Sequence, residues 1–351
     1  MAMRSLTVPP ARSARAARLR YVSDRDAGLA RVRAGRGFTY RTARRRAVRD
    51  PRVLTRIRAL AIPPAWTSVW ICPRPTGHLQ AVGRDARGRK QYRYHARWRE
   101  CRDENKYARL VAFGRALGRI RRRVARDLTG FELSRERVVA TVVRLLETSL
   151  IRVGNEEYAR QNRSYGLTTL RSRHVQIRGP RLRFEFAGGK RHVVDVHDRR
   201  VAAIVRSCQD LPGHELFQYV DDDGRRRSVD SADVNAYLRQ AGGDDFTAKD
   251  FRTWSGTLLA LRTLAGSVER PPTKKRLLEA VRTVAERLGN TPAICRKCYI
   301  HPHVMDTYLA GGLARLDGRA GGASHLRDGL HVEERALLRF LGKPLLHQRS
   351  A

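Results

Sequence analysis

The sequence of 351 residues has few cysteines, few lysines and no long hydrophobic run. Its five cysteines are odd in number and scattered, which favours a reducing compartment over a disulfide framework. Cys295 and Cys298 form a CxxC pair, but no second pair stands at zinc-finger spacing, so we expect no metal there. No stretch approaches the ~18 apolar residues of a membrane span, and residues 1–20 lack the apolar core of a secretion signal. We therefore expect a cytoplasmic protein with no membrane partner.

Positive charge is what the sequence has in excess. Its 72 Lys and Arg residues face 34 Asp and Glu, which leaves a formal net charge of +38. A globular protein of this charge repels itself unless a polyanion neutralises it, and duplex DNA carries one phosphate charge per ~1.7 Å. Only 8 of the basic residues are lysine and 64 are arginine, so part of the excess reflects an arginine-rich composition. The charge nevertheless favours a nucleic-acid partner.

The length exceeds the ~250–300 residues at which a single hydrophobic core stops growing, so two domains are expected. Residues 1–20 read as a basic, flexible arm, and residues 21–95 as a small, strand-rich domain. Residues 96–106 are charged and lack aliphatic side chains, which is typical of a linker. Residues 107–351 read as a mainly helical domain with a three-stranded antiparallel insert. The predicted fold class is α+β.

Local signals place the elements within these domains. The small domain has candidate strands at Val69–Cys72, His78–Gly83 and Gln91–His95, and the larger domain has them at Val175–Ile177, Leu182–Phe186 and Arg191–Val196. Ser134 is positioned to cap an apolar helix, and Thr247 with Asp250 forms the capping box of another. A helix over 275–288 should stop at Gly289, and a short helix starting at 291–292 should carry Tyr299.

A DNA-binding chain could also break DNA, and the sequence contains residues suited to that chemistry. Breaking a phosphodiester without hydrolysis needs a nucleophile that holds the phosphate, cations for the non-bridging oxygens and a proton donor for the leaving oxygen. A tyrosine with arginines and a lysine meets these needs. The candidates are Arg152, Lys190, Arg252, Asn290 and Tyr299. Because lysine is rare in this chain, Lys190 beside a Gly-Gly turn is a notable member of the set.

These five residues, in this order, resemble the active-site residues of the type IB topoisomerases of poxviruses and their bacterial relatives. The run from Gly83 to Tyr94 is similar to the DNA-contacting strand pair of that family's small β domain. The runs Ile151–Gly154 and Gly166–Leu170 are similar to parts of its catalytic domain. The resemblance covers nearly the whole chain, from about Tyr21 past Tyr299.

The resemblance implies a role for each candidate. Tyr299 would attack the scissile phosphate and form a 3′-phosphotyrosyl ester, while Lys190 would protonate the departing 5′-oxygen. Arg152 and Arg252 would bind the non-bridging oxygens, for which planar guanidinium groups are suited. Asn290 stands where the family commonly has histidine, so it would donate a hydrogen bond but could not act as acid or base.

The resemblance also implies a setting for the reaction. It would need neither ATP, metal nor other cofactor, and a monomer would act on double-stranded DNA at the nucleoid. Residues 21–95 and 107–351 would be the DNA-clamping and catalytic domains, closing on duplex through the linker. The expected DNA contacts are Arg89, Gln91, Tyr92, Tyr94, Tyr158, Arg160 and Lys249, the last supporting the phosphate site.

Two other interpretations stay open on the sequence alone. A tyrosine recombinase uses the same nucleophile and arginines, but it has an HxxR motif where this chain has Lys249-Asp250-Phe251-Arg252. It would also lack the small N-terminal domain. A non-enzymatic architectural protein could bind DNA through its charge, although the ordered candidate set speaks against it.

Overall fold

The computed structural model describes residues 10–35, 37–86, 88–130, 132–266, 271–313 and 328–342, with the backbone alone at 102–106. The chain divides into two compact units, Met1–Ala108 and Arg109–Ala351. The division falls within helix α3 (Ala96–Asp127). None of the helices in the described ranges has the length and apolarity that crossing a bilayer requires.

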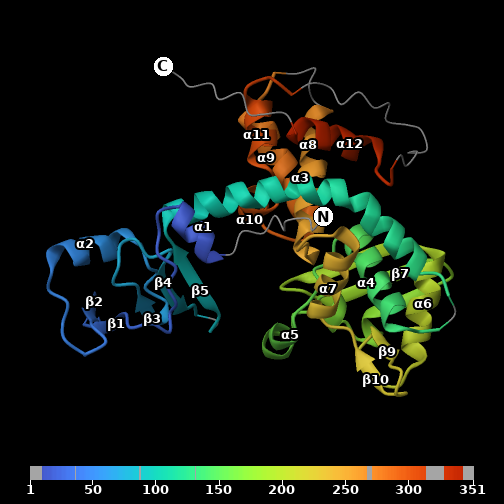
Figure 1. The fold of residues 1–351 in the computed structure, drawn as a ribbon, viewed down its shortest axis with the longest axis horizontal. Helices are drawn as coiled ribbons and strands as arrows, with labels where there is room; N and C mark the ends of the chain where they lie inside the picture. The colour runs from blue at the N-terminus through green and yellow to red at the C-terminus, as the bar shows by residue number, and fades with distance from the viewer. Residues whose placement is uncertain are drawn as a thin grey trace. The chain divides into compact units, whose positions relative to one another are not determined.

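The first unit is built on a five-stranded antiparallel sheet with the strand order β2-β1-β3-β4-β5 (Figure 1). Its elements are α1 (Pro10–Ala16), β1 (Leu29–Ala34), β2 (Gly37–Arg41), α2 (Pro51–Ala59), β3 (Thr67–Ile71), β4 (Leu79–Arg84) and β5 (Lys90–Tyr94). Leu29, Ile57 and Ile71 form the centre of its core with two smaller side chains. The sequence predicted the last three strands but not β1 and β2. Only Leu29 of β1 is buried, and arginines occupy every second position after it. The sequence therefore lacks the alternation of apolar and polar residues that predicts a strand.

Two expectations about flexible segments were wrong within the described residues. Residues 1–9 of the expected arm lie outside these residues, but Pro10–Ala16 forms α1. Ala14 and Leu19 pack against Trp98 in a small buried cluster. The expected linker, 96–106, forms the start of α3. It contains neither glycine nor proline, and arginine and glutamate are good helix formers, so high charge alone did not indicate a break.

The described part of the second unit is mainly helical and contains two small sheets. Its elements are α4 (Arg135–Ser149), α5 (Glu156–Asn162), β6 (Val175–Arg178), β7 (Arg181–Ala187), β8 (Arg191–His197), α6 (Arg199–Asp210), β9 (Gln218–Val220), β10 (Arg226–Ser228), α7 (Ser231–Gly242), α8 (Ala248–Ala265), α9 (Lys274–Leu288), α10 (Pro292–Cys298), α11 (Pro302–Leu309) and α12 (Val332–Leu341). Helix α4, capped by Ser134 as predicted, contacts α6, α7, α8 and strand β8 and is the central helix of this core.

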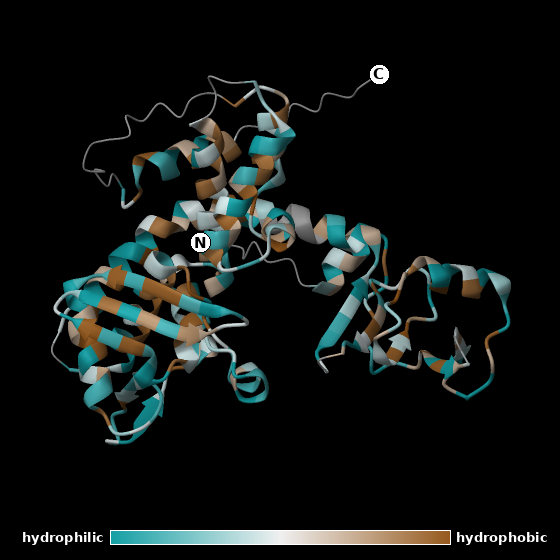
Figure 2. Ribbon diagram, turned by 180° about the vertical axis from the view of Figure 1, so that it is seen from behind, coloured by the Kyte–Doolittle hydropathy of each residue, from teal (hydrophilic) through white to brown (hydrophobic). Residues whose placement is uncertain are grey.

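The predicted three-stranded insert is confirmed as the antiparallel sheet β6-β7-β8. Leu182, Phe184 and Phe186 alternate along β7 and are all buried, while the intervening residues face outward. Figure 2 shows this alternation as brown and teal bands on the strands. Together with the strand-rich first unit, it confirms the α+β fold class.

Capping residues set the ends of the helices near the candidate residues. Thr247 and Asp250 form the predicted capping box of α8. Helix α9 ends at Gly289, whose φ of 61° lies in the left-handed region that glycine adopts without strain. Pro292 starts α10 as predicted, but the helix ends at Cys298. Tyr299 is therefore the residue that follows α10, not a residue within it, since its φ of −128° is no longer helical.

A buried ion-pair network joins α3, α4 and α12 within the second unit. The Arg121 guanidinium contacts Glu334 at 2.7 Å and Glu147 at 2.6 Å, and Trp254 donates a hydrogen bond to Glu334 at 3.3 Å. Burial opposes ionisation of Glu334, but the bonds from Arg121 outweigh it and hold the pKa of this carboxyl below its ordinary value. The network therefore stabilises the fold most when Glu334 is ionised.

Glu334→Gln is expected to lower the free energy of unfolding by about 3 kcal/mol, because the buried Arg121 guanidinium loses one of its two carboxylate partners. The ion pair between Arg121 and Glu147 remains. The contribution of a carboxyl with a depressed pKa is present above its unfolded pKa and is lost as pH falls through the folded one. Wild type should therefore lose more stability on acidification below about pH 4.5 than the variant. Urea melts from pH 7 to pH 3 measure this, and parallel loss in both proteins would contradict it.

Candidate active site

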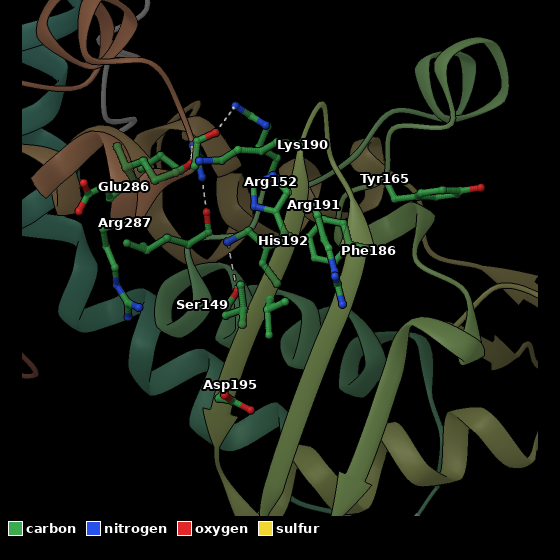
Figure 3. A pocket seen from close by; sticks show the side chains of 17 residues that line it. Ser149, Arg152, Tyr165, Phe186, Lys190, Arg191, His192, Asp195, Glu286 and Arg287 are labelled. Atoms are coloured by element: carbon green, nitrogen blue, oxygen red, sulfur yellow. Dashed lines mark hydrogen bonds between the residues drawn. The ribbon is translucent and has the colours of Figure 1, made fainter. Parts of the chain in front are cut away.

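A pocket of about 490 Å³ lies in the second unit where three segments meet. They are the end of α4 with the residues after it (149–152), the β7–β8 hairpin and the end of α9 (286–289). Figure 3 shows Arg152, Lys190 and His192 toward one end of this pocket, and Asp195 farther along β8. Basic side chains dominate its polar lining.

Arg152 links all three segments. Helix α4 is followed by its C-cap residue Leu150, which adopts a left-handed conformation with a φ of 58° and turns the chain toward the pocket. The Arg152 guanidinium donates hydrogen bonds to the carbonyl oxygens of Gly188 and Gly289, each at 3.3 Å. It also donates to Oδ1 of Asn290. One side chain therefore holds the hairpin and the residues after α9 together.

Arg252 of α8 lines the pocket and is buried, with 4% of its surface exposed. Its guanidinium donates to the carbonyl oxygen of Leu150 and, at 2.7 Å, to that of Leu288. It lies 5.2 Å from the centre of the Tyr299 ring. Burial lowers the pKa of Arg252, with Tyr299 opposing the shift and Arg152 adding to it. Arginine remains protonated in spite of this shift, so a charged group lies next to the tyrosine.

Lys190 lies at the tip of the β7–β8 hairpin. The tip is closed by a hydrogen bond from the Gly188 amide to the Lys190 carbonyl oxygen at 2.8 Å. Burial and then the charges of Arg152, Lys190 and Arg252 lower the pKa of His192, which the carbonyl of Gly188 opposes. All three cations line the same pocket as this histidine.

No carboxylate in the part of the chain that the structure describes is paired with these three cations. Among the described residues, no aspartate or glutamate forms an ion pair with Arg152, Lys190 or Arg252, and Asp195 pairs with an arginine of β7 at 3.1 Å. Two buried donors, Nε of Arg252 and Nδ2 of Asn290, have no hydrogen-bond partner within the described ranges. Buried donors and charges are normally paired because leaving them unpaired costs about 1–3 kcal/mol or more. The site is therefore suited to an anionic ligand with several acceptor oxygens.

Tyr299 does not line the pocket but contacts it through Arg252. Its carbonyl oxygen accepts a hydrogen bond from the Thr257 hydroxyl of α8 at 3.2 Å. Gly256 makes this approach possible, since a Cβ there would lie 2.7 Å from the Tyr299 carbonyl oxygen and 3.2 Å from its Cβ. Helix α8 thus carries Arg252 and also supports the tyrosine backbone.

Gly256→Ala is expected to displace Tyr299. If this tyrosine is the nucleophile that the resemblance implies, the variant should lower the strand-cleavage rate by about tenfold to a hundredfold, since ~1 Å errors in catalytic groups have such effects. The overpacking should also cost about 1–3 kcal/mol of stability. Single-turnover cleavage and thermal melts measure both effects. Gly266→Ala, where an added methyl meets no atom closer than 3.4 Å, is the matched control. Equal rates for the two variants would contradict the supporting role of Gly256.

The candidate DNA contacts of the first unit lie on or beside the edge strand β5. Tyr92 and Tyr94 are 45% and 39% exposed, and their rings stack with centroids 5.9 Å apart. Arg89 and Gln91 both bond to Asp85, at 2.7 Å and 2.9 Å. Both tyrosines are thus exposed on the edge strand, while Asp85 balances the charge of Arg89.

The candidate contacts of the second unit lie outside the pocket. Tyr158 and Arg160 are exposed on α5, which has no buried residue. Lys249 is exposed in the first turn of α8. The structure thus brings the five catalytic candidates together through contacts with pocket residues but does not bring Lys249 into the pocket.

The sequence analysis missed three residues of this region: His192, Gly256 and Thr257. For His192 a signal existed, because it follows Lys190 by two residues at the start of β8. Gly256 and Thr257 gave no such signal, since their contacts with residue 299 depend on how α8 packs.

Comparisons with known proteins agree with this geometry. The family model for the catalytic core of eukaryotic DNA topoisomerase I matches residues 95–311, and that for the N-terminal domain of bacterial DNA topoisomerase IB matches residues 37–85. DNA topoisomerase 1B of Acanthamoeba polyphaga mimivirus is 31% identical over 293 residues, covering 80% of this chain and 87% of the relative. DNA topoisomerase 1B of Vaccinia virus (strain Copenhagen) is 24% identical over 236 residues, covering 64% and 71%. The chain therefore belongs to the type IB DNA topoisomerases, enzymes that change the topology of DNA.

Proposed function

We propose that this chain relaxes supercoiled DNA by cutting one strand through Tyr299 and resealing it. The observation that supports this most is the cluster of Arg152, Lys190 and Arg252 with no carboxylate partner among the described residues. Such a cluster fits the non-bridging oxygens of a phosphodiester, and Arg252 lies directly over the tyrosine ring.

In the cleavage step the phenolic oxygen of Tyr299 attacks the scissile phosphorus. A bond forms between this oxygen and phosphorus as the bond from phosphorus to the 5′-oxygen breaks. The phenolic proton passes to solvent, and the departing 5′-oxygen takes a proton from Nζ of Lys190. The products are a 3′-phosphotyrosyl ester and a free 5′-hydroxyl, and resealing is the reverse of these steps.

Arg152 and Arg252 stabilise the negative charge that develops on the non-bridging oxygens during this step. Both side chains are held in place before DNA binds, Arg152 by Gly188 and Gly289, and Arg252 by two backbone carbonyls. Groups held in this way need little reorganisation in the transition state. Asn290 adds a hydrogen bond from Nδ2, which has no partner in the unbound protein.

The phosphotyrosyl ester retains the bond energy of the cleaved linkage, so resealing needs no nucleotide. The arginines stabilise the charge on the phosphate and the lysine protonates the leaving oxygen, so the chemistry requires no metal. Between the two steps the free strand end rotates in the direction that torsion dictates.

DNA binding would involve both units. Tyr92 and Tyr94 on β5 and Tyr158 on α5 are exposed and fit contacts with groove edges and backbone. Arg89, Gln91, Arg160 and Lys249 would add polar and phosphate contacts. The first unit would serve to hold duplex DNA and the second to cut it, in a monomer that acts at the nucleoid.

The test is relaxation of negatively supercoiled plasmid in excess EDTA without nucleotide. The proposal expects full relaxation, and quenching with detergent should trap protein on the end that carries the 3′-phosphate. Duplexes labelled on either side of the cut distinguish this linkage from the opposite one. Binding without relaxation would support an architectural role, and a requirement for metal or nucleotide would overturn the mechanism.

A further inference from the structure

Within the second unit, His192 is the least explained residue of the pocket. It follows Lys190 on β8, is half-buried, and none of the steps proposed above uses it. Its ring stacks on Phe186 of the neighbouring strand, with centroids 5.1 Å apart and planes 14° from parallel. The ring is therefore held in a fixed orientation across the hairpin.

The contacts of His192 lead to the turn that carries Lys190. Its Nε2 lies 3.2 Å from the carbonyl oxygen of Gly188. A carbonyl oxygen only accepts, so Nε2 carries the proton in this bond. The same oxygen accepts from Arg152, while the Gly188 amide donates to the Lys190 carbonyl. The amide N–H and the carbonyl oxygen of Gly188 thus both form hydrogen bonds that fix the turn.

The ring also packs against the turn that precedes Asn290. A Cβ on Gly289 would lie 2.4 Å from Cε1 of His192 and 3.0 Å from Nδ1. Gly289 accepts a hydrogen bond from Arg152, so His192 and Arg152 meet the same two glycines, one in the hairpin and one after α9. The histidine lies between the lysine hairpin and the residues that bind the phosphate.

We propose that His192 is a positioning residue that holds the Gly188–Lys190 turn so that Nζ of Lys190 reaches the departing 5′-oxygen. This inference rests on the proposed function and deepens it, since it names what orients the proton donor. The depressed pKa of His192, due to burial and to Arg152, Lys190 and Arg252, keeps the ring neutral near pH 7 and adds no fourth charge beside Lys190. His192 itself touches neither phosphate nor leaving oxygen in this arrangement.

A change of leaving group separates this role from a general structural one. When sulphur replaces the bridging 5′-oxygen, the departing thiolate needs no proton, because its conjugate acid has a pKa of about 8.5. A defect in proton delivery should disappear with this substrate. A defect in folding, phosphate binding or nucleophile placement should remain.

The experiment measures single-turnover cleavage of both duplexes by wild type, His192→Phe and Lys190→Ala. Phenylalanine keeps the stack on Phe186 but removes the Nε2 hydrogen bond. Lys190→Ala should lose about 10²–10⁴-fold on the oxygen substrate, the range for a general acid, and His192→Phe about 10–100-fold. Both should cleave the sulphur substrate at near the wild-type rate. His192→Gln, which restores a donor, should recover part of the oxygen rate, and His197→Phe at the exposed end of β8 serves as control.

The outcomes distinguish the inference from the function on which it rests. If Lys190→Ala is rescued by sulphur but His192→Phe is equally slow on both substrates, the positioning role is overturned while the proton-donor role stands. If sulphur rescues neither variant, the assignment of Lys190 fails and the inference fails with it. Full activity of His192→Phe on the oxygen substrate would also overturn it.

Discussion

Tyr299→Phe is expected to abolish strand cleavage and plasmid relaxation, by at least about 10⁴-fold, because it removes the oxygen that bonds to phosphorus in the proposed mechanism. DNA affinity should change little. The ring keeps its place near Arg252, since Thr257 holds the backbone of residue 299 and not its hydroxyl. Cleavage of end-labelled duplex and binding by gel shift measure the two effects.

The matched control for this change is Tyr219→Phe, which removes a hydroxyl from a partly buried tyrosine on β9. It should relax plasmid at the wild-type rate. If Tyr299→Phe still forms a covalent complex with DNA, another residue is the nucleophile. If it loses DNA binding and thermal stability together, the side chain has a structural role and the assignment loses its support.

Arg152→Ala is expected to slow cleavage by about 10²–10³-fold, the usual effect of removing one preorganised donor to a developing anion. Arg152→Lys should recover only a small part of this rate. An ammonium group is a point charge and cannot replace a planar guanidinium that bonds to Gly188, Gly289 and Asn290 at once. Single-turnover rates at saturating enzyme separate the chemical step from binding.

Arg181→Ala is the control for the loss of charge. Arg181 is an exposed arginine of β7 that pairs with Asp195 at 3.1 Å, so its removal should leave the cleavage rate unchanged. Arg152 also joins three segments, and thermal melts are needed to show that the variant remains folded at the assay temperature. Cleavage within a factor of about three of wild type by folded Arg152→Ala would overturn its place in the mechanism, because such a factor is far below the effect of a lost donor.

Features that depend on neighbours in the chain could be predicted from the sequence. Ser134, the Thr247–Asp250 capping box and Gly289 mark helix ends because capping involves residues within one turn. The alternation of apolar residues in β7 predicted the three-stranded insert for a similar reason, since successive side chains of a strand face opposite sides. The family resemblance also predicted which distant residues form one active site. No local sequence pattern gives this information.

Local patterns failed where exposure or sequence separation removed the signal. Strand β1 buries only Leu29, so its sequence shows no alternation of apolar residues and the strand was not predicted. The high charge of residues 96–106 was interpreted as a linker, although these residues form a helix. The composition, the α+β class and the helix ends at Ser134, Thr247 and Gly289 were therefore determined by the sequence itself. Only the tertiary structure decided that Arg152 meets Asn290, 138 residues away, and that Gly256 admits the backbone of Tyr299. Such contacts arise from the packing of whole helices and strands, so the sequence around either residue does not predict its partner.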